Sequence, residues 1–188
     1  MSDSAQTAAV LLWQHWQART RLANLPSACR PASRAQGYAV QAALAGLTGQ
    51  PVAGWKIAAT SSAGQQHIGV DGPLAGRLFA DRMLAPGATV SLAGNQMRVI
   101  EAEFAFRMAD DLPPRTAPYT QAEVMAAVQS LHPTIEVPDS RFENFASAGQ
   151  AQLIADCACA CWLIVGPPMP SQWRSADRES NEEIAAQE

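Results

Sequence analysis

The stretch VIEAEFAFRM, residues 99–108, alternates in the manner of a β-strand with two different faces. Successive side chains of a strand point to opposite sides, so one face carries Glu101, Glu103, Ala105 and Arg107 and the other Ile100, Ala102, Phe104, Phe106 and Met108. Two glutamates on one face can each give an oxygen to one hard cation at about 2.0 to 2.6 Å. The pattern predicts either a cation site or an amphipathic strand whose polar face meets water, with Arg107 partly balancing the charge.

A third carboxylate belongs with this pair. Glu136 lies between Ile135 and Val137 in a short β-type run, and turn-forming residues follow directly at 138–140. Carboxylates held close together repel one another unless a positive charge lies between them. Three carboxylates with open coordination positions would suit Mg²⁺ or Mn²⁺, whereas the alternative for Glu136 is a solvated strand end.

Lys56 is the basic residue in the run GWKIAA, residues 54–59. The small residues Gly54 and Ala58 share its strand face, which leaves room beside the ammonium group. A lysine desolvated there could bind an anionic substrate or, with a lowered pKa, move protons; the alternative is that it extends to water. Asp71 opens a glycine-rich turn, residues 70–77, which either covers a pocket or reverses the chain.

Helical spacing and capping signals predict four helices. They are expected at residues 8–22, with Trp13 and Trp16 on the core, at 33–47 with Ser33 as N-cap, from the capping box at Thr120 to His132, and at 144–155. Short runs between Gly and Pro predict the strands. These are Val52–Ala59, Arg77–Phe79, Thr89–Leu92, Met97–Met108, Thr134–Val137 and Cys161–Val165.

Composition excludes several classes of partner. The chain of 188 residues has 13 Lys and Arg against 17 Asp and Glu, with no basic block for a nucleic acid backbone. Its apolar runs are far shorter than the roughly 20 residues that cross a bilayer. The N-terminus lacks the basic start of a secretory signal, so we expect a cytoplasmic protein with no nucleic acid or membrane partner.

Three of the four cysteines alternate at Cys157, Cys159 and Cys161. Their spacing and apolar neighbours favour buried thiols in a reducing compartment. The alternative is a zinc site in which these thiolates are joined by Cys29 or a histidine.

Four segments, in this order, resemble the fumarylacetoacetate hydrolase superfamily, and within it the branch of 2-oxopent-4-enoate hydratase and 4-oxalocrotonate decarboxylase. They are GWKIAATS at residues 54–61, GVDGP at 69–73, EAEFAF at 101–106 and IEVPDSR at 135–141. The resemblance implies an α+β fold, with a mixed β-roll behind an N-terminal helical segment. The divisions would be a helical segment at 1–50, an incomplete roll with the metal site at 51–166, and a polar tail at 167–188.

The resemblance also implies the site. Glu101, Glu103 and Glu136 would hold Mg²⁺ or Mn²⁺, with Lys56 and Asp71 near a bound 2-oxo acid and no organic cofactor. In such enzymes the cation binds the substrate's C1 carboxylate and C2 oxygen and stabilises the enolate. The branch further implies a homo-oligomer, or association with a decarboxylase or hydratase partner.

The function that follows is a hydro-lyase adding water to a 2-hydroxy-2,4-dienoate during aromatic catabolism. Decarboxylation of a 2-oxo-3-enedioate and hydrolysis of an acylpyruvate are the alternatives. Family members continue beyond this chain with further strands of the roll, and the resemblance fades after Trp173. A truncated or frame-shifted product is therefore expected, and an inactive remnant or partner-binding subunit is the alternative from another class.

Overall fold

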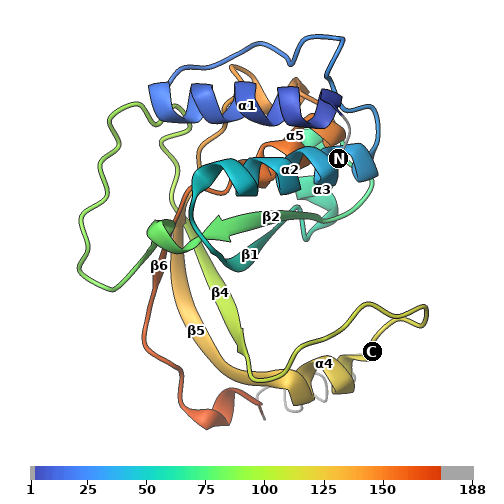
Figure 1. Ribbon diagram of the computed structural model, residues 1–188. Helices are drawn as coiled ribbons and strands as arrows, with labels where there is room; N and C mark the ends of the chain where they lie inside the picture. Colours follow the sequence, from blue (N-terminus) through green and yellow to red (C-terminus); the bar gives the residue numbers. More distant parts are fainter. Residues whose placement is uncertain (1–2, 175–188) are drawn as a thin grey trace. The chain divides into compact units, whose positions relative to one another are not determined.

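The chain divides into two compact units, and the computed structural model describes residues 3–174 (Figure 1). The first unit consists of Met1–Glu101 and Glu136–Ile164, and the second of Ala102–Ile135 and Val165–Glu188. The division into 1–50, 51–166 and 167–188 stays a prediction. The last fourteen residues of the predicted polar tail lie outside the described residues.

Helices α1 (Asp3–Ala18), α2 (Arg34–Thr48) and α5 (Gln150–Ala155) pack together in the first unit (Figure 1). Small side chains of α1 form the contact, since Ala8, Ala9 and Leu12 are fully buried. The two tryptophans expected in the core, Trp13 and Trp16, are only half-buried. The two indoles contact each other, and Trp16 also contacts Phe79 and the guanidinium groups of Arg82 and Arg141.

The predicted second helix is confirmed. Ser33 precedes α2 and accepts a hydrogen bond from the backbone N–H of Gln36, and Gly49 ends the helix with φ of 66°. The αL conformation at the C-terminal end is one that glycine adopts without steric cost. Among the described helices, none is both long and apolar enough to span a membrane.

Two sheets follow the helices. Strand β1 (Val52–Ala58) pairs antiparallel with β2 (Leu74–Phe79), and a short helix that the sequence did not predict, α3 (Ser62–Ile68), lies between them in the chain. The second sheet has the order β3-β6-β5-β4. Its strands are β3 (Met83–Leu84), β4 (Glu101–Met108), β5 (Val128–Val137) and β6 (Trp162–Val165).

Several expected elements differ in the structure. The helix expected at residues 8–22 runs from Asp3 to Ala18, because Arg19 turns left-handed and Thr20 N–H donates back to His15 O. The segment Thr89–Leu92 is not a strand, because turns on both sides take its backbone out of any ladder: Ala88 N–H donates to Ala85 O and Asn95 N–H to Leu92 O. The helix expected at 144–155 is split into a 3₁₀ turn, Phe145–Ser147, and α5. Gly149, with φ of 84°, separates them, since a left-handed residue cannot continue a right-handed helix.

The helix that begins after Thr120 is shorter than predicted. Helix α4 (Gln121–Ala127) starts with the predicted capping box, but β5 begins at Val128 and includes His132 and Pro133. His132 Nδ1 is 2.9 Å from Gly166 O, and Gly166 N–H donates to Pro133 O. These strand contacts outweigh the helical spacing of Val128 and Leu131 because propensity is a weak prior against tertiary pairing.

Replacing the N-cap of α4 should lower stability measurably. Thr120 Oγ1 accepts from the backbone N–H of Glu123, and the Glu123 carboxylate accepts from the backbone N–H of Thr120. Thr120→Ala removes the first of these two bonds. It should lower the free energy of unfolding of the second unit, which contains α4, by about 1 kcal/mol. Urea titration followed by circular dichroism measures the loss. Thr116→Ala, on the exposed loop before the helix, should change stability by less than about 0.5 kcal/mol, and equal losses would contradict the cap assignment.

Candidate metal and active site

Lys56 lies on the inward face of β1. Exposure alternates along this strand, so that Trp55 and Ile57 are about half exposed whereas Lys56 is 8% exposed. Its register partner on β2 is Gly76. A Cβ atom at Gly76 would lie 1.9 Å from the carbonyl oxygen of Cys157, so only glycine allows the Cys157–Cys159 turn to close over this face. The alternative that Lys56 extends to water is wrong.

The buried ammonium is held by two carboxylates. Lys56 Nζ lies 3.0 Å from Glu136 Oε2 and 3.7 Å from Glu101 Oε2. Burial has the largest influence on the pKa of Lys56 and would lower it, but the charges of Glu136 and Glu101 together outweigh burial and raise that pKa. Among these side chains alone, the two carboxylates therefore favour the protonated form of Lys56.

Glu103 follows Glu101 on the same face of β4 and completes the set. Each of Glu101, Glu103 and Glu136 offers a carboxylate oxygen, and the three atoms lie within 4.8 Å of one another. Glu136 is fully buried, and the other two are half-buried. With Lys56, the group has three negative charges against one positive charge. The net charge of −2 is the amount that one divalent cation neutralises.

The carboxylate face of β4 is thus the more buried one. Ile100 is 72% exposed and Phe104 68%, whereas Glu101 and Glu103 are only partly accessible. A solvated strand end for Glu136 is therefore wrong, whereas the polar face of β4 meets water in part, at half-buried Glu101 and Glu103 and at exposed Arg107. Burying a carboxylate costs solvation free energy. Lys56 offsets part of that cost for these glutamates because its positive charge compensates part of their negative charge.

The donor set fits a hard cation. Oxygens bound to one ion at about 2.0 to 2.6 Å lie at most about 5 Å apart, and the three carboxylate oxygens already meet that spacing. Carboxylate oxygens without thiolate or imidazole favour Mg²⁺, Mn²⁺ or Ca²⁺ over zinc or copper. Within residues 3–174, a group of acidic, histidine or cysteine side chains with spacing suited to a metal ion occurs at these three glutamates.

The cysteines have a different environment from a zinc site. Cys157, Cys159 and Cys161 are buried free thiols, as expected, and burial raises the pKa of Cys157 and of Cys159 to about 12. In the part of the chain that the structure describes, the cysteines do not form a group with the spacing of metal ligands, so the structure does not support the zinc alternative.

Asp71 lies on the exposed turn between α3 and β2. Its carboxylate accepts hydrogen bonds from Gln150 and Arg34, with the Arg34 Nη1 to Asp71 Oδ1 distance at 3.2 Å. The hydrogen bond from Gln150 is the main cause of a lowered pKa for Asp71. Its recorded contacts are thus with α2 and α5, and its catalytic role stays a prediction.

A buried ion pair missed by sequence analysis fixes the segment after Glu136. Asp156, fully buried, pairs with Arg141 and accepts hydrogen bonds from Ser140 Oγ at 2.8 Å and from Arg141 N–H at 2.9 Å. Asp139 N–H donates to Cys159 O. An aspartate inside the apolar run before Cys157 was the available signal, since a buried carboxylate requires a cationic partner.

Comparisons with known proteins give relatives by sequence and a counterpart by fold. No protein-family model matches the chain. The sequence is 34% identical over 118 residues to 2-keto-4-pentenoate hydratase 2 of Dechloromonas aromatica (strain RCB), covering 63% of this chain and 44% of that protein. It is 32% identical over 148 residues to 2-keto-4-pentenoate hydratase of Burkholderia vietnamiensis (strain G4 / LMG 22486), covering 77% and 55%. The chain thus spans about half the length of the curated relatives it matches.

The fold has a solved counterpart. It matches 4-oxalocrotonate decarboxylase from Pseudomonas putida G7, complexed with magnesium and adipate, with a TM-score of 0.76 and 24% identity over 88% of this chain and 64% of that one. The likeness confirms the predicted α+β fold, and the names of the relatives confirm the resemblance inferred from the four sequence segments.

Proposed function

Since the chain is a homologue of the 2-keto-4-pentenoate hydratases and has the fold of 4-oxalocrotonate decarboxylase, we propose that it provides the metal-binding half of a hydro-lyase site. The reaction is addition of water to a 2-hydroxy-2,4-dienoate, which gives a 4-hydroxy-2-oxo acid. The observation that carries the proposal is the set of three convergent glutamates around Lys56. The matched decarboxylase binds magnesium, which supports Mg²⁺ or Mn²⁺ as the ion at these glutamates.

The three glutamates supply oxygen ligands and most of the negative charge that a divalent ion requires. When bound, the ion would polarise the carboxylate and 2-oxygen of the substrate and stabilise negative charge there as protons move. The exposed fraction of Glu101 and Glu103 leaves their side of the group accessible. Fully buried Glu136 would serve as the fixed ligand, because its strand end is held by the segment paired with Asp156.

Lys56 would orient the substrate. A protonated ammonium can donate up to three hydrogen bonds, and its positive charge attracts the carboxylate of a 2-oxo acid. Burial against β2 and the Cys157–Cys159 turn removes competing water from the lysine stem. Its ammonium lies 3.0 Å from Glu136 Oε2, beside the proposed cation position, so we assign Lys56 to substrate binding and proton donation.

Decarboxylation is the second candidate, favoured by the fold match to a decarboxylase. Both reactions place negative charge on the same 2-oxygen, so the same residues serve either. The hydrolase alternative requires an acid/base pair that often includes histidine. His15, His67 and His132 instead contact Thr20, Phe145 and Gly166 respectively. Homo-oligomerisation and association with a partner enzyme stay predictions.

Turnover by the purified chain tests the proposal. With Mg²⁺, the chain should remove the ultraviolet absorbance of 2-hydroxypenta-2,4-dienoate, and NMR should identify the 4-hydroxy-2-oxo acid as the product. EDTA should abolish the reaction, and added Mg²⁺ or Mn²⁺ should restore it. Lys56→Met should lower kcat by about 100-fold or more. Glu143→Gln, an exposed carboxylate outside the group, is the matched control. Release of CO₂ from 4-oxalocrotonate identifies the decarboxylase instead.

Absence of turnover in a folded chain that binds Mg²⁺ would favour the inactive or partner-binding alternative. Turnover that survives EDTA, or full activity in Lys56→Met, would contradict the metal and lysine assignments respectively.

A further inference from the structure

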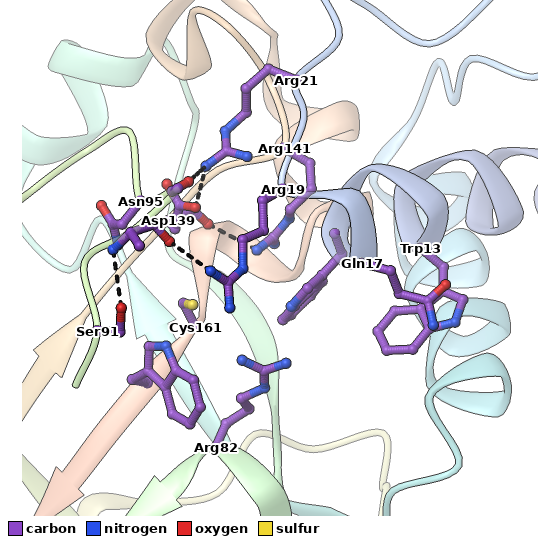
Figure 2. Close-up of a pocket in the computed structure, with 14 residues that line it drawn as sticks. Trp13, Gln17, Arg19, Arg21, Arg82, Ser91, Asn95, Asp139, Arg141 and Cys161 are labelled. Atoms are coloured by element: carbon purple, nitrogen blue, oxygen red, sulfur yellow. Dashed lines mark hydrogen bonds and ion pairs between the residues drawn. The ribbon is translucent and has the colours of Figure 1, made fainter. Parts of the chain in front are cut away.

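A polar pocket lies in the first unit, and neither Lys56 nor any of the three glutamates lines it. Its volume is about 220 Å³, and its walls come from α1 and the residues just after it, the turn at Arg82, the loop at residues 91–95, the segment after β5 and the start of β6. Arginine is its most frequent lining residue, at Arg19, Arg21, Arg82 and Arg141. Figure 2 shows the guanidinium groups of Arg19 and Arg82 turned toward each other, with Cys161 beside them.

Indole rings and guanidinium groups alternate along one wall. The Arg141 guanidinium lies 3.9 Å from the ring centroid of Trp16, and Arg82 lies 5.6 Å from Trp16 and 4.4 Å from Trp162. Stacking of a guanidinium on an aromatic face leaves its N–H groups free to donate in the plane of the group. The wall therefore presents flat apolar surface and directed donors together.

The charges around the pocket do not balance. Arg21 pairs with Asp139, Arg141 with Asp156 and Arg82 with Asp81. Arg19 has no carboxylate within 4.0 Å among the described residues, so one positive charge remains. Asp139 is the single carboxylate on the lining, and it already accepts hydrogen bonds from the backbone N–H of Gln96.

Arg19 is held in place by local structure. Arg19 directly follows α1 and has φ of 56°. This left-handed conformation is less favourable for residues that carry a Cβ atom than for glycine. Arg19 Nη1 donates to Ala93 O at 3.2 Å. A Cβ atom at Gly94 would lie 2.8 Å from Arg19 Cδ, so the loop glycine permits the arginine stem to pass. The left-handed conformation of Arg19 is the usual way for a helix to end, with Thr20 N–H donating to His15 O, and it directs the Arg19 side chain from the end of α1.

We propose that this pocket binds a small organic carboxylate, with Arg19 and Arg82 as its main donors and Trp16 and Trp162 against its carbon chain. The volume of about 220 Å³ is below the roughly 300 to 1,000 Å³ of sites for drug-sized ligands and suits a short organic acid. Planar guanidinium groups match a carboxylate in a bidentate manner, and the indole faces favour a ligand with carbon atoms over inorganic phosphate.

Calorimetric titration of the full chain with succinate, in EDTA and at low salt, tests this site. Succinate should bind saturably, with a change in tryptophan fluorescence, while phosphate binds more weakly. Arg19→Gln should weaken succinate binding about tenfold or more, because a hydrogen-bonded charge is lost. Arg19→Lys should cause an intermediate loss. Arg107→Gln, an exposed arginine of β4, should leave the affinity unchanged.

The variant Glu136→Gln distinguishes this pocket from the glutamate site. It should bind succinate with the same affinity as the unsubstituted chain, because Glu136 does not line the pocket. Failure of the unsubstituted chain to bind succinate, or tighter binding of phosphate, would overturn the proposal. Equal affinity in Arg19→Gln and Arg107→Gln would also overturn it, and so would loss of succinate binding in Glu136→Gln. Circular dichroism of each variant verifies the fold.

Discussion

Glu136→Gln is expected to weaken Mg²⁺ binding by about 100-fold or more while leaving the chain folded. Loss of residues that only support a metal ligand already costs about 10- to 100-fold in affinity, so loss of a charged ligand should cost at least as much. Glutamine has nearly the same shape but no charge, which changes the group from −2 to −1 in the presence of Lys56. Lys56 keeps Glu101 as a partner, which limits the effect on folding.

Binding of Mg²⁺ by calorimetry, or of Mn²⁺ by electron paramagnetic resonance, measures this loss without requiring turnover. Glu143→Gln removes the same charge from an exposed position close in the chain and should bind the ions normally. Similar affinities for the two variants would show that Glu136 is not a ligand. Glu101→Ala and Glu103→Ala should weaken binding in the same direction, since each offers an oxygen to the same group.

Asp156→Asn is expected to lower the free energy of unfolding of the first unit by about 3 to 5 kcal/mol. The change leaves the Arg141 guanidinium buried without its counter-charge, and the Arg141 side chain is only 2% exposed. Such a loss is a large part of the roughly 5 to 15 kcal/mol by which a domain is stable. The segment that follows Glu136 should loosen first, because Asp156 accepts its hydrogen bonds from Ser140 and from the Arg141 backbone.

Urea unfolding followed by tryptophan fluorescence measures this effect, because Arg141 lies over Trp16. Asp111→Asn, an exposed aspartate, should change stability by less than about 0.5 kcal/mol. Replacing both partners, as Arg141→Met with Asp156→Leu, should recover part of the loss since no uncompensated charge remains. A loss below about 1 kcal/mol in Asp156→Asn would show that the ion pair does not hold this segment.

Local patterns determined much of the fold. The alternation in residues 101–108 and the N-caps at Ser33 and Thr120 depend on side chains within a few positions of one another. Their interpretation needed no distant contact, and the strand and both caps formed as predicted, although α4 ends before its predicted end. At 128–133 a helical spacing was overridden, because pairing of β5 in its sheet supplies hydrogen bonds that the local pattern does not encode.

The metal site likewise has features that local sequence determined and features that only distant contacts determined. The sequence by itself determined that Glu101 and Glu103 share a strand face, and the ordered segments brought Glu136 and Lys56 into the same hypothesis. Only the tertiary structure decided that the carboxylate face of β4 turns inward and that Arg19, Arg82 and two tryptophans line one pocket. Periodicity fixes which side chains point the same way, but burial of a charge depends on a counter-charge from a distant segment. Lys56 provides it for the glutamates and Asp156 for Arg141.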